Sequence, residues 1–413
     1  MTVLILNRGP LSLRPYHEWL SDYPGPLLLL ASAEHLGGEP PPRAGGRYAY
    51  VEAIEDYDAT GRVEARALGL ADLFDIRHVV ACQELDLQRA AALRELLGLP
   101  GQGVASADGY RDKLRMKQLM TTAGIAVAPH AEVETATDVL AFAREHGYPL
   151  VLKPRDGLSS IGVRIIADEA ELLDWLADGF GDYTAAPRRL LVEAFVPGDM
   201  YHVDGFIRDG KVTVAWPSQY LYQLASFGDG LPRCDATLAP GPLADRLITF
   251  ATAVIDALPT PQCSTFHAEV FRTPDDRLVL CEIASRNGGA LIKALLKAMY
   301  DVDFPAAWVR ASVGLPVPAP DVVGPPRRMA GQVLLPKRAG VVRRIPNRPD
   351  ADWVEHFEVF VRPGDELSAA ATSGDYMAGM VVSGRDHAQC AARMRAAADW
   401  LARELHVDAL MTT

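Results

Sequence analysis

Two glutamates in this chain are spaced so that the two strands of one hairpin can present them together. Glu269 follows His267 in an alternating apolar–polar run, and Glu282 lies in the apolar run 278–283. Turn-forming residues at 273–276 separate the runs, so the pattern predicts a β-hairpin with both carboxylates close together. Like charges so placed repel unless a cation neutralises them, and Mg2+ suits a pair of carboxylates. The pair is therefore a candidate magnesium site, and solvated acids on an exposed hairpin are the alternative.

The residues directly after this hairpin can stabilise negative charge. Arg286 precedes Asn287 and two glycines, Gly288 and Gly289. A guanidinium group can stabilise charge that spreads over a transferred phosphoryl group, and glycines let a substrate approach the backbone closely. Arg286 is therefore a candidate catalytic residue, and the two glycines are candidate substrate contacts.

A second candidate segment begins at Lys153, which ends the apolar strand predicted at 150–153 and is followed at once by Pro154. Backbone N–H groups and small side chains in the next residues allow a phosphate to approach, and the lysine adds positive charge. The segment fits either a phosphate-binding loop or an ordinary β-hairpin with a solvated lysine. The small residues of this loop are Gly157, Ser159, Ser160 and Gly162.

Two other glycine patterns resemble nucleotide-binding motifs but lack an essential residue. Residues 205–212 have the spacing of a P-loop, yet Val212 stands where a hydroxyl group would hold magnesium. Residues 101–106 begin a dinucleotide-binding pattern, but Ser106 replaces its third glycine. Neither segment is therefore predicted to bind a nucleotide.

The elements that must position these residues begin with a segment of alternating strands and helices. Such alternation over the first hundred residues is typical of a parallel, Rossmann-like sheet. Its predicted strands are 3–6, 27–30, 48–51 and 78–81, and its clearest helix is 87–97.

From residue 110 the pattern changes to helices, short strands and hairpins, which together with the first segment predicts a fold of α/β and α+β parts. Proline-rich stretches at 315–320 and 324–326 mark a boundary. Before it we predict helices 111–123, 135–145 and 169–176, strands 150–153 and 162–166, and a hairpin-rich sheet; beyond it we predict strands near 332–335 and 357–361 and a closing helix, 387–405.

Taken in order, these segments resemble the ATP-grasp superfamily, in particular its carboxylate–amine ligases that join amino acids or peptides. The resemblance implies an ATP-grasp core at 109–315 with its ATP lid at about 125–197, preceded by a Rossmann-like pre-ATP-grasp domain at 1–108 and followed by an α+β lobe at 316–413. Six motifs in the correct order carry it: Asp112-Lys113, Val151-Leu152-Lys153-Pro154, Gly157-x-Ser159-Ser160-x-Gly162, Val192-Glu193-Ala194-Phe195-Val196-Pro197-Gly198, Phe266-His267-Ala268-Glu269 and Glu282-Ile283-Ala284-Ser285-Arg286-Asn287-Gly288-Gly289.

The resemblance also implies roles at the matching positions. Lys113 and Lys153 would contact the ATP phosphates, and the small residues Gly157, Ser159, Ser160 and Gly162 would form the covering loop. Glu193 and the backbone of Ala194, Phe195 and Val196 would hold the adenine edge, Glu269 and Glu282 would bind Mg2+, and Arg286 would contact the γ-phosphate and then the acyl phosphate.

Two positions depart from the family pattern. Many relatives carry an acid where this chain has Met200, so Asp199 or His202 is the expected ribose contact. Many relatives carry asparagine where this chain has Ala284, so one magnesium ligand is either missing or supplied by Asn287.

Candidate specificity residues lie in the loop-rich stretch 216–235, which contains Tyr220, Tyr222, Phe227 and Arg233. An arginine there can pair with a substrate carboxylate, although a solvated surface arginine explains it equally well. His267 also has two interpretations, a base near the metal or a packed and hydrogen-bonded strand residue.

Composition and charge argue against several classes of protein. The net charge of −12, without clustered Lys and Arg, argues against a nucleic-acid partner, and no apolar run is long enough for a membrane helix. The N-terminus resembles a first strand rather than a signal peptide, and the five scattered cysteines match neither a disulfide framework nor a zinc site. The expected location is the cytoplasm, and a homodimer is a family-level expectation.

The expected function is ATP-dependent and Mg2+-dependent ligation of a small-molecule carboxylate to an amine through an acyl phosphate, in specialised metabolism. Alternatives are a ligase of primary metabolism that acts on a purine-pathway amine or D-alanine, and a biotin-type carboxylase. A catalytically silent nucleotide-binding regulator is a further alternative. It is disfavoured by the presence of Lys153, Glu269, Glu282 and Arg286.

Overall fold

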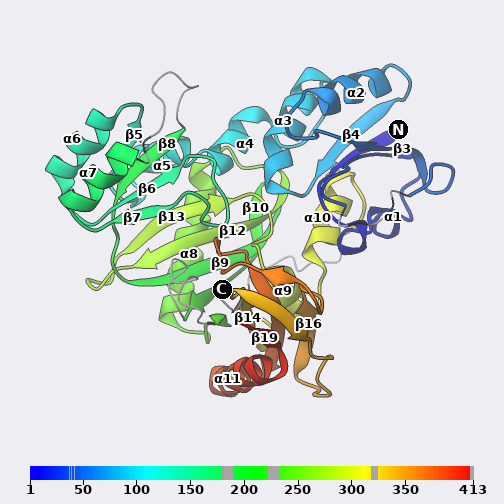
Figure 1. The fold of residues 1–413 in the computed structure, drawn as a ribbon. Helices are drawn as coiled ribbons and strands as arrows, with labels where there is room; N and C mark the ends of the chain where they lie inside the picture. The colour runs from blue at the N-terminus through cyan, green and yellow to red at the C-terminus, as the bar shows by residue number, and fades with distance from the viewer. Residues whose placement is uncertain are drawn as a thin grey trace.

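The computed structural model describes residues 1–409 except 37, 39, 41, 179, 181–188, 222–231 and 318–323. Figure 1 shows an α/β region at the N-terminus, a small sheet with two helices on the opposite side, and a long sheet that continues to the C-terminal helix. None of the described helices is long and apolar enough to cross a membrane.

The N-terminal region is a four-stranded parallel sheet in the order β3-β2-β1-β4, as the alternation of strands and helices predicts. β1 and β2 are buried along their whole length because separate apolar clusters cover the two faces of the sheet. The elements are β1 (Thr2–Asn7), η1 (Leu11–Leu13), α1 (Tyr16–Trp19), β2 (Leu27–Ser32), β3 (Tyr48–Ile54), α2 (Arg62–Ala71), β4 (Ile76–Ala81), η2 (Glu84–Asp86) and α3 (Leu87–Leu96).

The helix predicted over 111–123 is present, although it begins only at Lys113 and a separate helix ends at Arg111. α4 (Val104–Arg111) ends before Asp112, and α5 (Lys113–Thr122) begins after it. Asp112 has an extended backbone, and its side chain accepts hydrogen bonds from the N–H groups of Leu114 and Arg115. An aspartate that caps a helix in this way interrupts the preceding one, and it places Lys113 in the first turn of α5.

A small antiparallel sheet in the order β5-β8-β6-β7 follows, and two helices pack on it through one apolar cluster. Thr135 and Asp138 form a capping box at the start of α6, and Gly147 ends the helix, as predicted. The strand expected from residue 162 starts only at Arg164. The elements are β5 (His130–Val133), α6 (Ala136–His146), β6 (Leu150–Pro154), β7 (Arg164–Ile166), α7 (Glu169–Asp178) and β8 (Leu190–Ala194).

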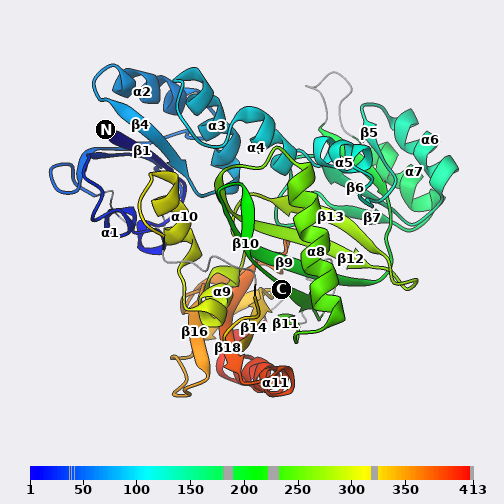
Figure 2. The ribbon, with the colours of Figure 1, turned by 180° about the vertical axis from the view of Figure 1, so that it is seen from behind.

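The long sheet is antiparallel, with eight strands in the order β13-β12-β9-β10-β11-β14-β18-β16. α8 (Pro242–Ala257) covers one face of its first half (Figure 2), and α11 (His387–Glu404), the predicted closing helix, packs on its second half. The strands are β9 (Asp199–Arg208), β10 (Lys211–Tyr220), β11 (Arg233–Thr237), β12 (Cys263–Arg272), β13 (Leu278–Ala284), β14 (Met329–Pro336), β16 (Val354–Val359) and β18 (Tyr376–Gly384).

The same sheet runs through the predicted core, 109–315, and the predicted C-terminal lobe, 316–413, because β11 pairs with β14. The predicted domain boundaries therefore stay a proposal. α9 (Ile292–Tyr300) packs against this sheet, and α10 (Phe304–Ser312) packs against α1 and β4 of the N-terminal region. The remaining strands, β15 (Gly340–Arg344), β17 (Glu366–Leu367) and β19 (His406–Asp408), form a separate small sheet.

All five cysteines carry free thiols, in agreement with the sequence analysis, which found no disulfide framework. Burial raises the pKa of the Cys281 thiol, which lines the cleft described below, to about 12. A thiol with such a pKa stays protonated at neutral pH, so Cys281 is a packing residue rather than a nucleophile.

A substitution at Gly205, in the middle of β9, tests how tightly the centre of the long sheet is packed. A Cβ atom there would lie 1.9 Å from the Val214 carbonyl oxygen and 2.6 Å from the Phe266 ring. Gly205→Ala is therefore expected to lower the free energy of unfolding by about 1–3 kcal/mol, measured by chemical denaturation. Gly69→Ala in α2 is the control, because nothing lies within 4 Å of that position. Equal losses in the two variants would contradict the packing.

Candidate active site

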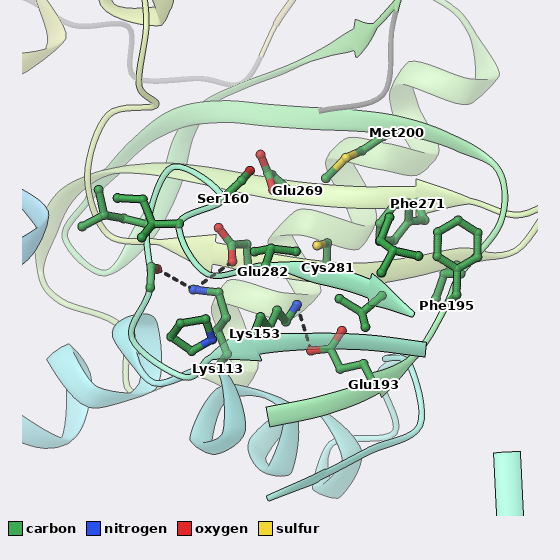
Figure 3. Close-up of a pocket in the computed structure, with 18 of the residues that line it drawn as sticks. Lys113, Lys153, Ser160, Glu193, Phe195, Met200, Glu269, Phe271, Cys281 and Glu282 are labelled. Carbon is green, nitrogen blue, oxygen red and sulfur yellow. Dashed lines mark hydrogen bonds and ion pairs between the residues drawn. The ribbon is translucent and has the colours of Figure 1, made fainter. Parts of the chain in front are cut away.

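A cleft lies between the small sheet and the first strands of the long sheet, and it encloses about 1070 Å³ of space that is partly open to solvent. Figure 3 shows side chains from both sheets and from the start of α5 pointing into it. Most of the predicted nucleotide and metal residues meet here: Lys113, Lys153, Gly157, Ser159, Ser160, Glu193, Ala194, Phe195, Val196, Glu269 and Glu282.

The predicted β-hairpin is confirmed, and it sets Glu269 of β12 directly opposite Glu282 of β13. Glu282 forms an ion pair with Lys113, with 3.1 Å between Oε2 and Nζ. Glu269 accepts a hydrogen bond from the Tyr220 hydroxyl (2.9 Å) and lies 3.4 Å from Nε2 of His267. Burial opposes ionisation of Glu282, but the nearby lysines outweigh it and hold its pKa well below the usual range. Glu282 is therefore ionised, and both carboxylates line the cleft.

A buried group of two lysines and one glutamate lies on the opposite wall. Lys153 Nζ lies 2.9 Å and Lys117 Nζ 3.2 Å from the same Oε1 atom of Glu193. Burial lowers the pKa of Lys117 despite the attraction of Glu193, whereas the carboxylates around Lys153 outweigh burial and raise its pKa. The carboxylate of Glu193 is thus occupied by ion pairs within the protein.

Lys117 was missed by the sequence analysis. It is fully buried, and its ammonium group also donates to the carbonyl oxygen of Cys281 (3.2 Å). It lies four residues after Lys113, so both lysines are on one face of α5. A second lysine on the buried face of an amphipathic helix was the signal that could have identified it.

Arg286 is held by the N-terminal region, through a residue that the sequence analysis also missed. Its guanidinium group forms an ion pair with Glu84 of η2 and donates to the carbonyl oxygen of Asn287 (2.6 Å). Arg111 donates to the other oxygen of Glu84 (2.7 Å) and to the carbonyl oxygen of Asp156 (2.7 Å). Burial alone would raise the pKa of Glu84, but the two arginines lower it. Glu84 therefore joins Arg286 to the start of the small-residue loop.

This loop, residues 157–162, is held by contacts at its first residue and at its two serines. Lys113 donates to the Gly157 carbonyl oxygen (2.8 Å). On the other side the Ser373 N–H group donates to the Ser159 carbonyl oxygen (3.2 Å), and the Ser160 hydroxyl donates to the Ser373 hydroxyl (3.2 Å). Ser159 and Ser160 both have positive φ, 52° and 58°, which is uncommon for residues other than glycine. Gly162, also predicted here, lies in the loop but is not part of the cleft lining.

Several predicted residues lie in a buried chain of polar side chains instead of the cleft lining. Nδ1 of His267 lies 2.8 Å from Asp204, which also forms a hydrogen bond with His202. His202 lies 3.7 Å from Asp235, and Arg233 lies 3.4 Å from the same carboxylate. The chain runs across β12, β9 and β11, and it explains why three potential metal ligands (His202, Asp204 and His267) are clustered.

Three residues that the sequence predicts to contact a ligand lie outside the cleft lining. His202, a predicted ribose contact, is fully buried away from the cleft, and Asp199 is exposed at the start of β9, while Met200 lines the cleft. Arg233, a predicted substrate contact, binds Asp235 within the protein and the Tyr376 hydroxyl (3.0 Å). Their predicted roles are untested. Tyr222 and Phe227 lie outside the described residues.

The packed interpretation of His267 fits the structure better than a role as base. Burial lowers the pKa of His267, but Asp204 and Glu269 outweigh burial and raise it to about 9. The ring therefore carries its proton at neutral pH, with one carboxylate at each nitrogen.

A second cavity adjoins the first, and Leu158 and Ser159 line both. The predicted substrate residues Arg286, Gly288 and Gly289 line this second cavity, together with residues of the N-terminal region and of α9. The two spaces therefore adjoin at the small-residue loop, and Arg286 belongs to the lining of the second. A long sheet and a small sheet that enclose such a lysine- and glutamate-lined cleft define the ATP-grasp fold.

Comparisons with known proteins agree with this fold. Residues 112–215 match the family described as the carbamoyl-phosphate synthase L chain, ATP binding domain, and residues 332–406 match the L-amino acid ligase C-terminal domain 2. An L-amino acid ligase from Bacillus licheniformis has a similar structure, with a TM-score of 0.76, 17% identity and 99% of each chain covered.

Two curated relatives are ligases. The L-arginine-specific L-amino acid ligase of Bacillus subtilis is 22% identical over 335 residues, which cover 78% of this chain and 79% of that protein. The alanine–anticapsin ligase of Bacillus amyloliquefaciens is 26% identical over 281 residues, which cover 61% of this chain and 57% of that protein. The chain is similar to the ATP-grasp carboxylate–amine ligases, and it is an ATP-dependent enzyme that forms carbon–nitrogen bonds.

The buried group of Lys117, Lys153 and Glu193 can be tested through stability. Lys117→Met leaves Glu193 with one partner, and breaking such a buried ion pair is expected to lower the free energy of unfolding by about 3 kcal/mol. Arg115→Met on the exposed face of the same helix is the matched control, with an expected change within about 0.5 kcal/mol. Equal stability of Lys117→Met and the wild-type protein in urea titrations would show that Lys117 does not stabilise this group.

Proposed function

We propose that the protein joins two amino acids or an amino acid and a peptide, by activating the carboxylate of one as an acyl phosphate with ATP. The observation that carries this proposal is that the two cavities adjoin, because Leu158 and Ser159 line both. The cleft has lysines and paired carboxylates suited to ATP and Mg2+, and the adjoining cavity, which Ser159 and Arg286 line, is large enough for amino acids.

ATP fits the cleft through specific groups. The backbone of residues 194–196 in the hinge between β8 and β9 would meet the adenine edge, while the Glu193 carboxylate stays with its two lysines. Lys113 and Lys153 would meet the phosphates, covered by Ser159 and Ser160. The ribose contacts would come from the hinge around Asp199 and Met200.

The pair Glu269 and Glu282 has the chemistry of a Mg2+ site, because both donors are carboxylates that lie opposite each other across the hairpin. A bound Mg2+ would neutralise phosphate charge and would leave Lys113 free to move from Glu282 to a phosphate. Ala284 supplies no donor, and Asn287 lies instead beside Arg286 in the second cavity.

The proposed reaction has two steps. A carboxylate oxygen of the first substrate attacks the γ-phosphorus, the bond to the β–γ bridging oxygen breaks, and ADP leaves. The amine of the second substrate then attacks the acyl carbon, the carbon–oxygen bond breaks, and phosphate leaves with one former carboxylate oxygen while the nitrogen loses a proton. Arg286 would stabilise the charge in both steps, and the loop 157–162 would exclude water.

The relationship to alanine–anticapsin ligase favours a role in specialised metabolism, whereas D-alanine–D-alanine ligases among the relatives keep a primary role open. Cytoplasmic location and a homodimer stay predictions.

Magnesium-dependent phosphate release from ATP across a matrix of paired amino acids tests the function. Wild-type protein is expected to release phosphate only when both an acid and an amine partner are present. Glu282→Gln is expected to reduce the rate by at least about 100-fold, because it removes one carboxylate of the proposed metal pair. Glu145→Gln on exposed α6 is the control and should keep the wild-type rate. Phosphate release that does not depend on any amine would contradict the proposal.

The substitution Arg286→Lys tests whether Arg286 acts in the chemical step or in nucleotide binding. Lysine keeps the charge but loses the planar group that holds Glu84, so the rate is expected to fall about 100-fold while the KM for ATP changes little. A large increase in the KM for ATP with an unchanged kcat would instead assign Arg286 to nucleotide binding.

A further inference from the structure

The second cavity has a charge opposite to that of the protein as a whole. The chain carries a net charge of −12, yet the lining of this cavity contains five cationic and three acidic side chains. The cavity encloses about 1700 Å³, partly open to solvent. The cations are Arg8, Arg14, Arg286, Lys293 and Lys297, and the acids are Glu84, Asp303 and Glu358.

Two of the five cations are neutralised by the protein itself. Arg286 binds Glu84, and Arg8 binds Asp58 and Asp86. These three carboxylates hold the two arginines in place, so neither arginine needs an external anion.

The other three cations, Arg14, Lys293 and Lys297, have no carboxylate within ion-pair distance in the described part of the chain. Lys293 Nζ donates to the carbonyl oxygen of Leu13 (3.1 Å), which brings α9 next to the turn that carries Arg14. Burial lowers the pKa of Lys293, Asp303 counteracts this effect, and Arg14 and Lys297 lower the pKa further. A group of cations that repel one another in this way is stabilised by a bound anion.

Of the three acids, only Asp303 lacks a basic partner in the described residues. Glu84 lies between Arg286 and Arg111, and Glu358 Oε2 lies 3.2 Å from His356 Nε2. Asp303 caps α10 by accepting from the Ala306 N–H group (3.1 Å). The cavity therefore offers three unpaired cations and one unpaired carboxylate.

We propose that this cavity selects an amino acid with a second carboxylate, such as L-glutamate or L-aspartate. Arg14, Lys293 and Lys297 bind the carboxylate that is not activated, and Asp303 faces the ammonium group. Such an amino acid has two negative groups and one positive group, which matches the unpaired charges of the cavity. The inference rests on the proposed function, because Arg286 and Ser159, which line the same cavity, would receive the activated carboxylate.

Isothermal titration of L-glutamate and L-glutamine tests this inference. Each is added to the full-length protein in the presence of Mg2+ and a non-hydrolysable ATP analogue. L-Glutamate, or L-aspartate compared with L-asparagine, is expected to bind at least about tenfold more tightly than the amide, because the amide cannot form the ion pairs. Lys293→Gln and Arg14→Gln are expected to remove this preference. Lys211→Gln, which changes an exposed cation at the start of β10, should keep it.

Equal affinity for acid and amide, or no binding of either dicarboxylic amino acid, would overturn the inference. A preference that survives in Lys293→Gln and Arg14→Gln would overturn the assigned residues, and exposed Lys297→Gln serves as a third variant that is not expected to disturb folding. Binding requires no turnover. Selective binding of glutamate without amine-dependent phosphate release would therefore reject the proposed function while this inference stands.

Discussion

The cleft removes several carboxylates from bulk water, and they stay ionised only where positive charge lies next to them. Glu193 is matched by Lys117 and Lys153, Glu282 by Lys113, and Glu269 by the protonated ring of His267. This pairing explains why lysines from α5 and β6 converge on one space. It also leaves the lysines and carboxylates close enough to exchange partners when a phosphate and a cation enter.

The same constraint joins parts of the chain that are far apart in sequence. Arg286, which follows β13, depends on Glu84 of the N-terminal region, and Glu84 is also bound by Arg111 at the end of α4. The loop over the cleft touches the turn at Ser373 before β18. The proposed site of phosphoryl transfer therefore borders three regions. A change in any one of them would alter the position of Arg286 or of the loop.

The sequence was sufficient for elements with strong local signals. Alternating residues and a clear turn predicted the hairpin of Glu269 and Glu282, and the strand followed by Pro154 and small residues predicted the position of Lys153 and its loop. The parallel N-terminal sheet followed from alternating strands and helices. Motif order then identified the superfamily, because six weak patterns in one order are far more specific than any one of them.

Features that depend on distant contacts were not predictable in this way. Nothing near Glu84 indicates that its partner is Arg286, 202 residues away. The break at Asp112 was hidden because residues on both sides favour a helix, and only the capping hydrogen bonds reveal it. His202 and Arg233 were predicted to contact ligands, but in the structure they pair with Asp204 and Asp235. This pairing depends on the order of strands in the sheet, which the sequence does not reveal. Polar residues in central strands can pair with each other as readily as with a ligand.

The most direct test of the central claim follows an oxygen atom. The carboxylate substrate is labelled with 18O in both oxygens, and the phosphate released with ATP, Mg2+ and an amine partner is analysed by mass spectrometry. An acyl phosphate intermediate predicts one 18O atom in the phosphate for each amide bond formed. Amide formation with unlabelled phosphate would contradict the account, because the carboxylate would then have been activated without forming a bond to the γ-phosphorus.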